Sequence, residues 1–167
     1  TTSSPYTTSS TIHPYTLIGV NYAYGMGLSG DGETVAVVDS GFNTSHEEFA
    51  NKVSSGEVTE YNTLSSTTHG THVAGTAAGD YNNNSSAFSS ANWSGTNYPL
   101  LSYGMMGVAY EAKLHLTDYD VAGSYTDTVA MMAAATSSAK TAGAIVQNNS
   151  WGWGNCRTAT GCSETID

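Results

Sequence analysis

A short apolar run that ends in an aspartate constrains the fold of this chain more than any other feature. Residues 34–38 read Thr-Val-Ala-Val-Val and are followed by Asp39. Such a β-branched, nearly all-apolar run is typical of a strand that is covered on both faces. Functional side chains of open parallel α/β sheets lie at the carboxyl ends of strands, so Asp39 stands where a working carboxylate is expected.

Small residues dominate a later segment, which opens with the string His-Gly-Thr-His-Val-Ala-Gly at His69. We predict a helix over residues 70–79, because its many glycines and alanines allow close packing against a sheet, although each glycine lowers the intrinsic helix preference. The seven-residue string is specific enough to indicate a protein family, whereas an Asp-Ser-Gly on its own would indicate only a turn.

The rest of the chain continues in alternating strands and helices. Residues 113–116 and 144–150 read as strands, and the alanine- and methionine-rich residues 126–140 read as a helix. The apolar positions of this helix that follow a spacing of three and four are Val129, Met132, Ala133 and Thr136. The alternation predicts the α/β class, a three-layer parallel sheet with helices on both faces and right-handed crossovers.

The segments around Asp39 and His69 together resemble the aspartate and histidine blocks of the subtilisin-like serine proteases. The resemblance covers roughly residues 15–154 and includes the string Gly-Val-Ala-Tyr at 107–110, where the family usually has Gly-Val-Ala-Pro. It implies the N-terminal part of a subtilisin-like catalytic domain over residues 15–167, with the fold incomplete in this chain. Residues 1–14, rich in Ser and Thr, are expected to form an extended N-terminal arm.

The resemblance also implies a chemistry. In this family an aspartate holds one imidazole nitrogen, so that the other nitrogen can take a proton from a serine hydroxyl. Asp39 and His69 match these two catalytic residues, and the expected activity is that of a serine endopeptidase. The family's serine block, Gly-Thr-Ser, does not occur in these 167 residues. We therefore expect the nucleophile on a C-terminal polypeptide of the same protease, and almost no activity from this chain alone.

Three explanations of the missing serine stay open. The protease is cut after folding and keeps its partner piece, the chain is a fragment, or it is a degenerate homologue that serves as a catalytically inactive peptide-binding module. Retention of both Asp39 and His69 argues against the third explanation, because a binding module gains nothing from either residue.

The other histidines carry no catalytic assignment. His72 matches a buried family position, one helical turn after His69, that usually serves packing. His13, His46 and His115 lack such a context, and we expect each to be a surface or packing residue.

The string Asn-Ser-Trp-Gly at residues 149–152 resembles the strand whose backbone pairs with the substrate in the family. An extended peptide added to such an edge gains main-chain hydrogen bonds. Ser150, Trp151 and Gly152 are therefore candidate binding residues for a peptide or protein substrate. The alternative is a core strand that is followed by an aromatic turn.

Two cysteines, Cys156 and Cys162, enclose a small polar loop, and no histidine or further cysteine stands nearby to complete a zinc site. We prefer a loop-closing disulfide over two free thiols, and this preference favours an oxidising compartment. The protein is accordingly expected to be secreted or at the cell surface. Residues 80–103, rich in Asn, Ser and Gly, read as a surface loop.

The charge balance excludes several kinds of partner. Four Lys and Arg residues stand against fourteen Asp and Glu residues, so little is present to neutralise phosphates and nucleic-acid binding is not expected. No stretch approaches the ~20 consecutive apolar residues of a membrane-spanning helix. No cofactor or metal ligand is assigned; calcium, with Glu48 as a candidate ligand, stays an alternative, because no compact calcium-binding loop of the EF type occurs.

Overall fold

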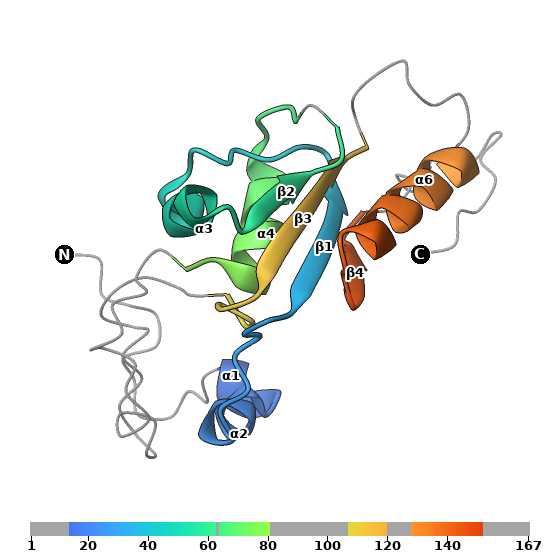
Figure 1. The fold of residues 1–167 in the computed structure, drawn as a ribbon. Coiled ribbons are helices and arrows are strands. Elements are labelled where there is room, and N and C mark those ends of the chain that lie inside the picture. The colour runs from blue at the N-terminus through green and yellow to red at the C-terminus, as the bar shows by residue number, and fades with distance from the viewer. Residues whose placement is uncertain (1–13, 63, 81–106, 120–127, 152–167) are drawn as a thin grey trace, which may run out of the picture.

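The computed structural model describes residues 14–62, 64–80, 107–119 and 128–151. These residues contain one four-stranded sheet, in which all pairs of neighbouring strands are parallel and the order is β2-β3-β1-β4 (Figure 1). The strands are β1 (Thr34–Asp39), β2 (Val58–Glu60), β3 (Lys113–Asp118) and β4 (Val146–Asn149). The predicted α/β class with a parallel sheet is confirmed.

Helices cover both faces of this sheet. The helix α4 (Thr68–Ala78) lies against one face together with the short helices η1 (Glu47–Phe49) and α3 (Ala50–Ser55), and α6 (Thr128–Thr141) lies against the other face (Figure 1). The expected three layers are therefore present in the described part of the chain.

Two further short helices lie at the end of the sheet where β1 begins, α1 (Pro14–Leu17) and α2 (Val20–Gly25) (Figure 1). Tyr24 attaches α2 to the rest of the molecule: its hydroxyl donates a hydrogen bond of 2.6 Å to the carbonyl oxygen of Val108. Burial is the main cause that raises the pKa of this phenol, so the hydroxyl stays protonated and able to donate.

The alternation of side chains along the strands sorts the core into two parts. Val37, Leu114 and Leu116 are 0% exposed and pack with Ala74 and Ala78 of α4. Val38, one position along β1, faces the other way and packs with residues of α6. Because successive side chains of a strand point to opposite faces, both faces of β1 are buried, as its apolar run predicts.

The helix α4 packs closely against the sheet through a stripe of small residues. Gly70, Ala74 and Ala78 are buried and recur every four residues, which places them on one face of the helix. The prediction of a close-packed helix is confirmed, but the expected burial of His72 is wrong. His72 is exposed, because it lies two positions from Gly70 and therefore on the opposite side of α4.

The helix predicted over residues 126–140 exists as α6, but the apolar spacing noted in its sequence does not mark the buried face. Val129 is 75% exposed, and Ala133 and Thr136 are also exposed, whereas Met132 is half-buried. The buried positions are Met131, Ala135 and Ala139. This helix carries alanine or methionine on several faces, so the periodicity of its apolar residues does not identify the one that meets the sheet.

Several elements differ from the sequence-based expectation in extent or existence. The strand predicted over residues 144–150 is shorter, since β4 begins at Val146 and ends at Asn149. β2 and α3 were not predicted, because both are short and polar. The predicted N-terminal arm up to residue 13, and the loop from residue 81 onward, lie outside the described residues.

Candidate active site

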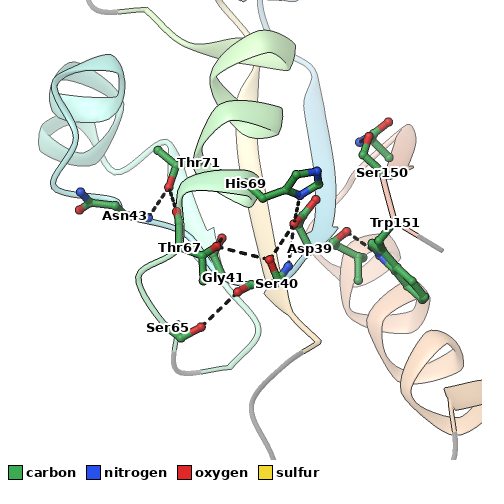
Figure 2. A network of polar contacts seen from close by, with 12 residues as sticks. Asp39, Ser40, Gly41, Asn43, Ser65, Thr67, His69, Thr71, Ser150 and Trp151 are labelled. Atoms are coloured by element: carbon green, nitrogen blue, oxygen red, sulfur yellow. Dashed lines mark hydrogen bonds and ion pairs between the residues drawn. The ribbon is translucent and has the colours of Figure 1, made fainter. Parts of the chain in front are cut away.

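Asp39 is the last residue of β1 and its side chain is 0% exposed. One carboxylate oxygen, Oδ1, accepts hydrogen bonds from the backbone N–H of Ser40 at 2.7 Å and from the Ser40 hydroxyl at 3.2 Å. The same oxygen lies 2.7 Å from Nδ1 of His69 (Figure 2). The other oxygen, Oδ2, is buried and has no hydrogen-bond partner among the described residues. Asp39 is thus oriented by its neighbour and points one oxygen at the imidazole.

His69 is the second residue of α4, and its side chain is 59% exposed. Its Nδ1 faces Asp39, and its Nε2 has no hydrogen-bond partner within the described residues (Figure 2). A neutral histidine whose Nδ1–H donates to a carboxylate presents Nε2 as an acceptor. The arrangement can therefore take a proton from a group that approaches from solvent.

The start of α4 is fixed to the segment that follows β1. Thr67, the residue before α4, donates a hydrogen bond of 3.0 Å from its hydroxyl to the carbonyl oxygen of Gly41. One turn into the helix, the Thr71 hydroxyl accepts a bond of 2.8 Å from the backbone N–H of Asn43 (Figure 2). His69 lies between these two attachments, so its backbone is held on both sides.

Gly70 allows the helix to approach β1 closely. A Cβ atom at this position would collide with the carbonyl oxygen of Gly41 and would lie 3.1 Å from Cβ of Asp39. Any larger residue would push α4 away from the strand end, and His69 would move with it. The glycine that follows His69 is therefore required by the geometry of the pair.

The candidate substrate-binding residues follow the exposed strand β4. Ser150 is exposed, and its hydroxyl accepts a hydrogen bond of 2.8 Å from the side chain of Asn148. The indole N–H of Trp151 donates to the carbonyl oxygen of Val38 at 2.9 Å, and its ring packs on Tyr119 at a centroid distance of 4.7 Å (Figure 2). Trp151 thus makes the contacts of a residue packed against the sheet, and substrate binding at this position and at Ser150 stays a prediction. Gly152 lies outside the described residues.

The remaining histidines occupy two kinds of position. His46 is exposed and caps η1, where its Nδ1 accepts the backbone N–H of Glu48. His115 is 4% exposed and bridges two elements: its Nδ1 lies 2.8 Å from the Thr59 hydroxyl and its Nε2 lies 2.9 Å from the Ser138 hydroxyl. Their assignment as surface and packing residues is confirmed, and His13 lies outside the described residues.

Glu48, the candidate calcium ligand, lies near the end of α4. Its carbonyl oxygen accepts the backbone N–H of Asp80 at 2.9 Å. Burial raises the pKa of the Asp80 carboxyl, and the positive charge of Lys52 opposes this shift. The described ranges contain no group of three or more His, Cys, Asp or Glu side chains placed to hold a metal ion. Calcium binding at Glu48 stays an alternative, and no chemical step is assigned to calcium.

Two further expectations concern the rest of the chain. Cys156 and Cys162 lie outside the described residues, so the disulfide between them stays a prediction. None of the helices in the described part of the chain combines the length and the apolar character needed to cross a membrane.

Comparisons with known proteins identify the family of the chain. The sequence model of the subtilase family matches residues 30–167. An extracellular serine protease of Serratia marcescens is 31% identical over 142 residues, which are 81% of this chain and 11% of the relative. The chain therefore spans about a tenth of the length of that protein.

A solved structure is similar in fold. The psychrophilic subtilisin-like protease Apa1 from the Antarctic psychrotroph Pseudoalteromonas sp. AS-11 matches 85% of this chain and 30% of its own chain, with a TM-score of 0.50 and 23% identity. At this identity the likeness supports the fold alone. The match of the family model over most of the sequence shows that the chain belongs to the subtilase family.

Proposed function

We propose that Asp39 and His69 are two members of an Asp-His-Ser triad that hydrolyses peptide bonds. The observation that carries the proposal is the 2.7 Å contact between Nδ1 of His69 and Oδ1 of a fully buried Asp39, with the opposite side of the imidazole open. The serine is supplied by a C-terminal portion of the same protease outside these residues. The activity is that of a serine endopeptidase of the subtilase family.

The proposal gives a role to each member of the pair. Asp39 accepts a hydrogen bond from Nδ1–H of His69, which leaves Nε2 of the neutral ring free to accept the proton of the serine hydroxyl as its oxygen attacks the peptide carbonyl. The protonated imidazole then gives that proton to the leaving amine. Asp39 stays ionised and stabilises the transient positive charge. A water molecule then attacks the acyl-enzyme with the same proton transfers through His69, which releases the carboxylic acid product and the free serine.

The substrate is proposed to bind as an extended peptide beside Ser150, Trp151 and Gly152. The polar residue Ser150 is exposed directly after β4, which among the described strands pairs with β1 alone. An unpaired strand edge offers backbone donors and acceptors to a peptide irrespective of its sequence. Trp151, packed against Val38 and Tyr119, would hold this segment in place.

The C-terminal portion is proposed to cover the apolar surface around β4. Ile145 and Val146 are 70% and 52% exposed. Exposed apolar residues at a strand edge favour association with further polypeptide. The name of the Serratia relative, an extracellular protease, supports secretion of this protein as well, and secretion would permit a disulfide between Cys156 and Cys162.

The test compares two histidines of α4 in the full-length protein. His69→Ala should lower kcat for a peptide substrate by roughly 10⁶-fold, as removal of the triad histidine does in subtilisin. The same change should abolish labelling by a serine-directed phosphonate. His72→Ala, at an exposed position one helical turn after His69, should leave both unchanged. Equal activity of the two variants at matched folding would refute the assignment.

The same experiment separates the alternative function. A folded wild-type protein that binds extended peptides, but neither hydrolyses them nor reacts with the phosphonate, would be a catalytically inactive peptide-binding module. Denaturing mass spectrometry of the labelled sample identifies which polypeptide carries the modified serine, and so decides whether a separate C-terminal chain supplies it.

A further inference from the structure

A second buried carboxylate, that of Asp118, lies next to Asp39 at the carboxyl end of the sheet. Asp118 ends β3 as Asp39 ends β1, and the two residues are partners in the parallel register. Both are buried, with 1% and 0% of their surface exposed. Residues paired in register point to the same face of a sheet, so both carboxylates lie on the α4 side. The proposed chemistry uses Asp39 and leaves Asp118 without a role.

The Asp118 carboxylate holds Ser65. Its Oδ2 accepts the backbone N–H of Ser65 at 2.7 Å and the Ser65 hydroxyl at 2.6 Å. Hydrogen bonds to an ionised acceptor are about twice as strong as neutral ones. The backbone of Asp118 also exchanges two hydrogen bonds with the side chain of Asn62, at 2.7 and 3.0 Å. Residue 118 therefore fixes the segment that leads to α4 at two points.

Ser65 in turn supports both members of the pair. Toward β1, its carbonyl oxygen accepts the backbone N–H of Phe42 at 2.6 Å, and a Cβ atom on Gly41 would collide with Ser65 and lie 3.0 Å from Oδ2 of Asp118. Toward α4, Ser65 stands two residues before Thr67, whose hydroxyl binds the carbonyl oxygen of Gly41. The chain after Asp39 and the chain before His69 thus meet on Ser65 (Figure 2).

We infer that Asp118 is a positioning residue for the Asp39–His69 pair. Through Ser65 it sets the separation between the end of β1 and the start of α4, and so the contact between the carboxylate and the imidazole. The inference rests on the proposed function for its consequence in catalysis. The positioning itself concerns the contact between Asp39 and His69, so it can be tested without measuring hydrolysis.

The experiment uses three variants of the full-length protein. Asp118→Ala removes the acceptor for Ser65, and Asp118→Asn keeps an oxygen that can accept the Ser65 N–H. Leu116→Ala, on the same strand and the same face, removes buried packing without touching Ser65 and serves as the matched control for stability. Each variant is compared with wild type by Tm, by kcat and KM for a peptide substrate, and by the low-field proton resonance of Nδ1–H in His69.

Asp118→Ala should lower kcat on the order of 10- to 100-fold, because small displacements of reacting groups have effects of this size. KM should change less than about twofold, since the substrate strand is not touched. The His69 resonance should shift or broaden. Asp118→Asn should recover a large part of kcat and should return the His69 resonance toward its wild-type position. Leu116→Ala should lower Tm, while kcat and the His69 resonance stay as in wild type.

Two results would overturn the inference. One is an unchanged His69 resonance in Asp118→Ala, and the other is a loss of kcat in Leu116→Ala as large as that in Asp118→Ala. A wild-type protein without peptidase activity, whose His69 resonance nevertheless changes in Asp118→Ala and recovers in Asp118→Asn, would support the positioning role and refute the proposed function. If Asp118→Ala does not fold, Ser65→Ala, which removes the hydroxyl donor alone, should give a smaller change of the same resonance.

Discussion

The carboxylate of Asp39 is completely buried, whereas the imidazole of His69, 2.7 Å away, is 59% exposed. This asymmetry suits the proposed division of roles. A buried carboxylate that accepts several hydrogen bonds keeps one orientation, because its alternatives would leave donors such as the Ser40 N–H unpaired. An exposed imidazole can be reached by a hydroxyl group and a peptide. The pair is therefore fixed on one side and accessible on the other.

Asp39→Asn should lower kcat of the full-length protein by roughly 10⁴-fold, the size reported for the equivalent change in a serine protease triad. The amide keeps the shape of the side chain but removes the charge that stabilises the imidazolium of His69. KM should change little. Steady-state kinetics measure both values, and circular dichroism confirms folding. Activity within tenfold of wild type would contradict the assigned role of Asp39.

Two glycines of α4 should respond in opposite ways to substitution by alanine. Gly70→Ala should lower both Tm and kcat, because the added methyl collides with Gly41 and moves α4 away from Asp39. Gly75→Ala has nothing within 4 Å of the added atom. It should leave kcat unchanged and stabilise the helix by up to about 1 kcal/mol. Thermal unfolding and steady-state kinetics test the pair, and equal effects of the two changes would contradict the close approach at Gly70.

Burial of His115 should make stability depend on pH. Burial lowers the pKa of this imidazole below its ordinary value of 6.5. Because the unfolded chain binds the proton more readily, the contribution to stability is fully present above pH 6.5 and is lost as the pH falls toward the pKa of the folded state, by at most about 1.4 kcal/mol per pH unit.

The measurement for His115 is Tm as a function of pH in wild type and in His115→Gln. The variant keeps a group that can bind Thr59 or Ser138 but does not titrate in this range. We expect the decline in Tm below pH 6.5 to be weaker in the variant. The exposed His46, His69 and His72 are present in both proteins and cancel in the comparison. Identical pH profiles would show that His115 contributes nothing to this dependence.

The buried lysine of α3 should be important for stability. The Nζ atom of Lys52 donates hydrogen bonds of 2.8 and 2.6 Å to the carbonyl oxygens of Tyr110 and Ala112, and the residue is 1% exposed. Lys52→Met should lower the free energy of unfolding by about 2–4 kcal/mol, since both acceptors lose a donor. The neighbouring exposed Val53 provides the control. Val53→Ala should change the free energy of unfolding by less than about 0.5 kcal/mol. Chemical denaturation measures both.

The elements with a strong local signal could be predicted from the sequence. The apolar run that forms β1 and the small residues that form the packed stripe of α4 each carry their pattern within a few consecutive residues. Asp39 and His69 stand at the ends of these elements, so the motif strings were sufficient to nominate them. Their nomination needed no knowledge of contacts.

Burial of polar residues could not be predicted in this way. Lys52 is acceptable in the core only because two carbonyl groups nearly sixty positions later in the chain face it. The face of α6 was equally undetermined, since its alanines and methionines leave no single apolar stripe. In both cases the deciding partners are distant in sequence, and a local pattern contains no information about them.

The sequence by itself determined which chemical groups are present and which elements carry them: a carboxylate at a strand end and an imidazole at a helix start. Only the tertiary structure decided that Asp118 lies beside Asp39, that Ser65 connects the two strand ends to α4, and that His72 faces solvent. The physical reason is that register and helix orientation are set by which surfaces bury one another, and that outcome belongs to the whole fold rather than to any one segment.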